Sequence, residues 1–64
     1  MYILNLHLKT DGGVKSLGDS EFFEVPNIGE AVEIGGDFFR IVDKVTMSNG
    51  IVNLIVERIT NPLL

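Results

Sequence analysis

The chain has no cysteine and no tryptophan, and its 64 residues include one histidine and two prolines. Without cysteine no disulfide can form, and a zinc site built from cysteine and histidine is excluded because His7 is the single histidine. A domain of this size buries only about 60% of the surface that its unfolded chain exposes. Its stability must therefore come from an efficient core or from oligomerisation.

Cationic side chains are also few. Five lysines and arginines stand against nine aspartates and glutamates, which gives a net charge of −4. Because a duplex-binding protein neutralises phosphates with clustered cations, nucleic acid is a disfavoured partner. No apolar run is long enough for a membrane span or a signal peptide, so we expect a cytoplasmic protein without a membrane partner.

Apolar residues, in contrast, make up 45% of the chain, which is a high share for so small a domain. They alternate with polar residues, and no stretch keeps the period of a helix. The pattern predicts a first strand from Tyr2 to Lys9 and further strands at Glu21–Val25, Ala31–Ile34, Phe38–Met47 and Ile51–Ile59. Between the first two, Val14–Ser20 has the composition of a long mobile loop with at most a short strand at its start. We predict one all-β domain over residues 1–64, a small five-stranded antiparallel SH3-like barrel or a strongly curled sheet.

Glycine-containing turns set the predicted strand registers. A turn at Gly36-Asp37 pairs Glu33 with Arg40 across the strands, and a turn at Gly35-Gly36 is the alternative that loses this charge pair. Asn49-Gly50 predicts a type I′ turn, which turns Val45 and Met47 toward the core.

Continuing the second register places Asp43 opposite Val56 on the apolar face. A carboxylate there is unfavourable, so we predict a β-bulge near Asp43-Lys44 that turns Asp43 outward and Val42 inward.

The stretch from Val25 to Val45 combines a proline and a glycine, a short strand, a glycine turn and a strand that begins with two aromatic residues. In this order it resembles a hairpin pattern of very small SH3-like barrel proteins from bacteria and phages. The resemblance covers about a third of the chain. It implies a barrel hairpin and carries no functional residue across.

Catalytic and ligand-binding motifs are not evident. His7 has only Asn5 and Lys9 beside it on its strand face, and neither residue activates an imidazole as a general base. The paired glycines precede no lysine-serine step and no helix, as a phosphate loop requires, and the acidic residues lack the spacing of a calcium loop. We therefore predict no catalytic residue, no metal and no cofactor, and we expect a protein that is not an enzyme.

The predicted self-association interface consists of apolar residues that the interior of a single barrel cannot accommodate. They are Ile3, Ile51, Ile55, Ile59, Leu63 and Leu64. The alternative is that the Val14–Ser20 loop covers this face within one subunit. Each of the two Phe-Phe pairs must also turn one ring outward, so Phe22 and Phe38 are the predicted contacts with a partner protein.

These features favour a non-enzymatic interaction module that forms a homo-oligomer and binds another protein. The chain begins with Met1 and is very small, which is typical of stand-alone genes of phages and mobile elements that inhibit a host protein. One alternative is an oligomer that sequesters a small ligand between its subunits. Another is a barrel that binds single-stranded nucleic acid through exposed aromatic rings.

Overall fold

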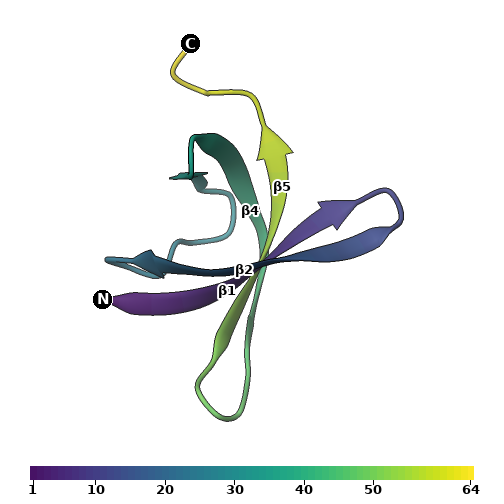
Figure 1. Ribbon diagram of the computed structural model, residues 1–64. Helices are drawn as coiled ribbons and strands as arrows, with labels where there is room; N and C mark the ends of the chain where they lie inside the picture. Colours follow the sequence, from purple (N-terminus) through teal and green to yellow (C-terminus); the bar gives the residue numbers. More distant parts are fainter.

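The computed structural model describes all 64 residues and contains five strands and no helix. The strands are β1 (Tyr2–Thr10), β2 (Gly13–Phe22), β3 (Ala31–Ile34), β4 (Asp37–Thr46) and β5 (Val52–Ile59). They form one sheet in the order β2-β1-β5-β4-β3. The sheet is so strongly curled that the β1–β2 and β4–β5 hairpins project in different directions (Figure 1). The predicted all-β class and curled five-stranded sheet are confirmed.

The centre of the sheet is a parallel pair. β1 and β5 run side by side with Asn5 opposite Asn53 and Leu8 opposite Val56, whereas the other three pairings are antiparallel. The prediction that the sheet is antiparallel throughout is therefore wrong at this pair. β5 is therefore hydrogen-bonded on both sides, and β2 and β3 are the edges. Residues 23–30 carry the chain from one edge to the other, and Pro26 in this segment is buried.

Six apolar side chains from the three central strands form the core on the inner face of the sheet. They are Leu4, Leu6, Phe39, Ile41, Leu54 and Val56, none more than 3% exposed. Successive side chains of a strand point to opposite faces, so the alternating pattern of the sequence places these residues correctly. Val25, from the segment that joins the two edges, packs against this core.

Val14–Ser20 is strand, and the prediction of a mobile loop is wrong. It belongs to β2, which pairs with β1 along its whole length, while the strand predicted at Glu21–Val25 ends at Phe22. Nearly every β2 side chain is exposed, so backbone hydrogen bonds and not burial hold this strand. Gly18, with a φ of 85°, accommodates a bulge that leaves Leu17 without a partner in β1. A strand exposed on both faces has no apolar period for the sequence to show.

The β3–β4 hairpin turns at Gly35-Gly36, so the predicted turn at Gly36-Asp37 is wrong. Both glycines have a positive φ, of 61° and 90°, as a type I′ turn requires. Glu33 consequently lies opposite Phe38 instead of Arg40. Its carboxylate accepts a hydrogen bond of 2.7 Å from the backbone N–H of Gly36 and so stabilises the turn itself.

The β4–β5 hairpin has a three-residue loop, Ser48–Gly50, in place of the predicted two-residue turn. The N–H of Met47 donates to the carbonyl of Ile51 at 2.7 Å, and the N–H of Gly50 donates to the carbonyl of Met47 at 2.9 Å. Gly50 has a φ of 90° and Asn49 has no positive φ, so type I′ geometry is wrong. The loop is a type I turn followed by a glycine in the left-handed region.

The longer loop shifts the β4–β5 register by one residue. Val45 and Met47 therefore lie on the outer face of the sheet and not toward the core as predicted, because such a shift exchanges the two faces of a strand. A bulge then restores the register of the core, with Val42 as the extra residue between Ile41 and Asp43. The predicted bulge is thus present, one residue earlier, and Asp43 is exposed as expected. Val42 does not turn inward as predicted, because it is the extra residue of the bulge and is not among the side chains that pack against the core.

Replacing Gly50 with alanine should lower the free energy of unfolding by about 1 kcal/mol, measured by urea denaturation, because a Cβ disfavours positive φ. Gly12→Ala is the matched control. Gly12 has no positive φ, and a Cβ at either position meets no heavy atom within 4 Å. Equal effects of the two substitutions would contradict the left-handed conformation of Gly50.

Hydrogen exchange should be slowest in β5 and fastest in β2. β5 is paired on both sides and carries the fully buried Leu54 and Val56, whereas β2 has one neighbour and exposed side chains. The measurement is exchange of backbone amides followed by nuclear magnetic resonance. Protection in β2 as strong as in β5 would show that the edge hairpin is covered in solution.

Candidate functional site

Four apolar side chains on the outer face of the sheet form what we call the outer apolar patch. It consists of Ile3 (65% exposed), Val45 (43%), Met47 (48%) and Ile51 (45%). The strand register explains the grouping. Val45 lies opposite Asn53, and the backbones of Met47 and Ile51 are hydrogen-bonded to each other. Asn5 and Asn53 are opposite each other in the parallel pair, and Ile3 and Ile51 each lie two residues before one of them. The patch therefore collects residues of β1, of β4 and its hairpin, and of the start of β5.

The patch ends at a polar contact between β1 and β5. The imidazole Nε2 of His7 lies 3.0 Å from Oδ1 of Asn53, at hydrogen-bonding distance, and both side chains are half-buried. Ile55 lies opposite His7 in the parallel register and is also half-buried. The hydrogen-bonding partner of His7 is thus an amide and not a carboxylate, and the contact links β1 to β5 on the outer face.

The six residues of the predicted interface do not gather in one place. Ile3 and Ile51 belong to the outer apolar patch, whereas Ile55 lies beside His7 and the half-buried Ile59 pairs with Phe38 on β4. Leu63 and Leu64 are 87% and 102% exposed in a terminal turn, where the N–H of Leu63 donates to Oδ1 of Asn61 at 2.9 Å. Sequence reasoning missed Val45 and Met47, and the only signal for them is the length of the Ser48–Gly50 loop.

The two Phe-Phe pairs each divide between the faces of the sheet. Phe39 is in the core and Phe38 is half-buried on the outer side, as predicted for that pair. The other pair is reversed, because Phe22 packs against the core and Phe23 is 84% exposed. Phe22 lies opposite Tyr2 at the end of β2, and this pairing fixes which ring turns inward.

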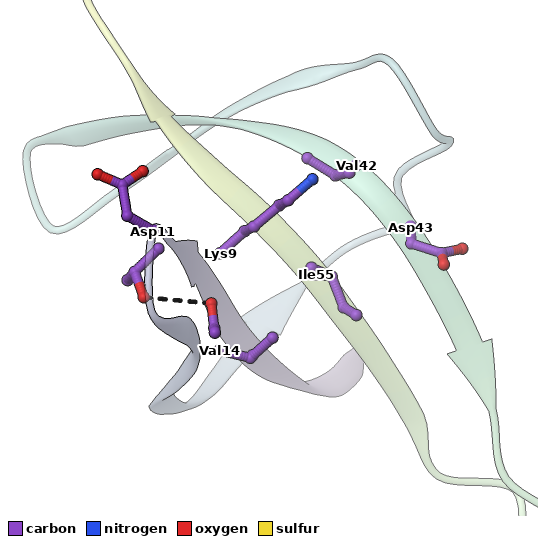
Figure 2. Close-up of a pocket in the computed structure, with 8 residues that line it drawn as sticks. Lys9, Asp11, Val14, Val42, Asp43 and Ile55 are labelled. Atoms are coloured by element: carbon purple, nitrogen blue, oxygen red, sulfur yellow. Dashed lines mark hydrogen bonds between the residues drawn. The ribbon is translucent and has the colours of Figure 1, made fainter.

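A hollow of about 400 Å³ lies between the tip of the β1–β2 hairpin and the bulge in β4 (Figure 2). Its apolar lining is Val14, Val42 and Ile55, and its charged lining is Lys9, Asp11 and Asp43. A second, smaller hollow of about 250 Å³ lies beside Ile3 and is lined by Asp19, Ser20 and Glu21.

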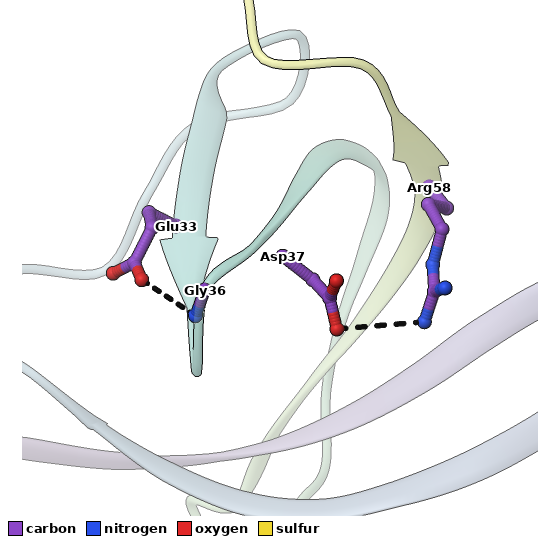
Figure 3. Close-up of polar contacts among 4 residues, drawn as sticks. All are labelled: Glu33, Gly36, Asp37 and Arg58. Atoms are coloured by element: carbon purple, nitrogen blue, oxygen red, sulfur yellow. Dashed lines mark hydrogen bonds and ion pairs between the residues drawn. The ribbon is translucent and has the colours of Figure 1, made fainter.

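The single ion pair of the chain joins the first residue of β4 to β5 (Figure 3). Nη2 of Arg58 lies 3.6 Å from Oδ2 of Asp37, and both side chains are more than half exposed, so the pair contributes at most about 1 kcal/mol. The guanidinium of Arg58 also lies 5.8 Å from the ring centroid of Phe39. No three histidine or carboxylate side chains come together as metal ligands would.

Comparison of the chain with protein-family models, with curated proteins and with solved structures gives no significant match. The structure contains no helix of the length and apolarity that crossing a membrane takes.

The assignment of the aromatic rings can be tested by two matched substitutions. Phe39→Leu should lower the free energy of unfolding by about 1 to 2 kcal/mol because it leaves a gap in the core. Phe23→Leu should change it by less than about 0.5 kcal/mol, since this ring is exposed. Thermal or urea denaturation measures both, and a larger loss for Phe23 would mean that this ring is covered in solution.

Proposed function

We propose that this protein is a non-enzymatic interaction module that self-associates through the outer apolar patch and binds another protein. The observation that carries the proposal is the patch itself: four large apolar side chains, each at least 43% exposed, on one face at one end of the sheet. Scattered apolar residues are normal on a surface, but several on one face of a sheet are typical of an interaction site.

The total accessible surface area of the chain also supports self-association. The chain exposes 4477 Å², whereas a folded monomer of 7.1 kDa is expected to expose about 4,100 Å². Only seven residues are buried, so much of the apolar content has no place in the core of one subunit. Burial of exposed apolar surface stabilises by about 25 cal/mol per Å², and a second copy of the patch supplies the matching surface.

We propose that the binding partner is another protein and that the two bind each other in the cytoplasm. The small size of the chain and its resemblance to small SH3-like barrels favour a phage- or mobile-element-encoded inhibitor of a host protein. Phe23, at 84% exposure, Tyr2, at 52%, and the half-buried Phe38 are aromatic side chains available for that contact. The net charge of −4 favours a partner with a basic surface over a nucleic acid.

Sedimentation equilibrium tests the self-association. We expect the wild-type chain to form a dimer or a larger species, and Ile51→Glu to be monomeric because a carboxylate in the patch must lose its water on association. Ile28→Glu is the matched control, since Ile28 is 59% exposed on the segment between β2 and β3, outside the patch.

Circular dichroism must show that both variants are folded. A wild-type chain that stays monomeric at high concentration contradicts self-association. Dissociation by Ile28→Glu to the same extent as by Ile51→Glu contradicts the location of the interface.

A further inference from the structure

The hollow between the hairpin tip and the β4 bulge is built by two irregularities of the sheet. Val42 and Asp43 are neighbours in sequence and would point to opposite faces of a regular strand, but both line the hollow because Val42 is the extra residue of the bulge. Across from them, the hairpin tip brings in Lys9, Asp11 and Val14. The volume of about 400 Å³ lies within the range of small-molecule sites, roughly 300–1,000 Å³.

Charges of both signs lie around this hollow without neutralising one another. No ion pair or side-chain hydrogen bond joins Lys9 to Asp11 or Asp43, since the only ion pair of the chain lies elsewhere. Asp43 is held in place by its own backbone, because its Oδ1 accepts a hydrogen bond of 2.8 Å from the N–H of Lys44. The second carboxylate oxygen of Asp43 has no partner within the chain.

Between the charges lies an apolar surface. Val14, Val42 and Ile55 contribute it, and Figure 2 shows Lys9 extending across the hollow toward Val42. A ligand with a single charge matches only part of this lining. A carboxylate would be attracted by Lys9 but repelled by the two aspartates, and an amine would be attracted by the aspartates but repelled by Lys9. A ligand with both charges on one aliphatic chain matches all of it.

We propose that the hollow binds a small zwitterion in which an aliphatic chain joins an ammonium group to a carboxylate. Lys9 holds the carboxylate, Asp43 holds the ammonium group, and the methylene chain lies on Val14, Val42 and Ile55. Asp11 lies on the opposite side of Lys9 from Asp43 (Figure 2) and does not contact the same ammonium group. Opposed charge-assisted hydrogen bonds then fix the direction in which the ligand lies.

This site is separate from the outer apolar patch. Along β1 and β5 the His7–Asn53 contact lies between them, with Ile3 and Ile51 on one side and Lys9 and Ile55 on the other. A monomeric Ile51→Glu variant should therefore bind the zwitterion as the wild type does. Zwitterion binding and self-association can therefore be refuted independently of each other.

The probe is 6-aminohexanoate, added to the full chain and followed by the amide and methyl resonances of the lining residues. We expect saturable shifts at Val14, Val42 and Ile55, with a dissociation constant of about 1 mM for a ligand of this size. Hexanoate and hexylamine each lack one charge and should bind at least about tenfold more weakly, which corresponds to one charge-assisted contact. Glycine and 4-aminobutyrate form a length series that measures the separation of the charged groups.

Two substitutions that preserve side-chain shape complete the test. Lys9→Met and Asp43→Asn should each weaken binding of 6-aminohexanoate about tenfold. An asparagine at position 43 can still accept the hydrogen bond from Lys44, so the bulge is retained. Lys15→Met, in the same hairpin but outside the hollow, should bind as the wild type does.

The proposal is overturned if 6-aminohexanoate causes no saturable shift, or if hexanoate or hexylamine binds equally well. It is also overturned if the Lys9 and Asp43 variants bind as the wild type, or if Lys15→Met loses as much affinity as they do.

Discussion

The backbone ladder between β1 and β5 joins the two halves of the chain into one sheet. One half is the antiparallel β1–β2 hairpin and the other is the antiparallel set β3–β4–β5, and the parallel pairing from Asn5 to Leu8 is the only strand pairing between them. That pairing brings Leu4 and Leu6 against Leu54 and so completes the core. It also brings His7 to Asn53 and thereby orders the outer face. A hairpin alone is marginally stable in water, so each half depends on this ladder.

The sequence predicts the fold well where one face of a strand is buried and poorly elsewhere. The alternating residues of β1, β4 and β5 identify the strands and most of the core, because burial imposes a period of two. Most of β2 is not predicted, because nearly all of its side chains are exposed on both faces of the strand and show no apolar period. The parallel partner of β1 is not predicted either, since the same apolar pattern fits a parallel or an antiparallel neighbour.

The candidate site depends on a detail that composition cannot supply. Ser48-Asn49-Gly50 can close a hairpin with a loop of two residues or of three, and the two loops place Val45 and Met47 on opposite faces of the sheet. The three-residue loop adds both side chains to the outer surface and requires the Val42 bulge to bring Ile41 back into the core. One loop residue therefore determines both the apolar patch and one wall of the charged hollow. Fold alone assigns no activity to such a sheet, so these two surfaces carry the functional argument.

The parallel contact between the first and the last strand also constrains the order in which the chain can fold. Asn5 and Asn53 lie near opposite ends of the sequence, so their pairing closes a loop that contains most of the chain. The entropy of closing that loop is lost before the core contacts compensate for it, whereas the three hairpins close short loops. We therefore expect the hairpins to form first and the docking of β1 on β5 to come last. Until that step the apolar sides of both halves are exposed, and encounters between partly folded chains compete with the docking that buries them.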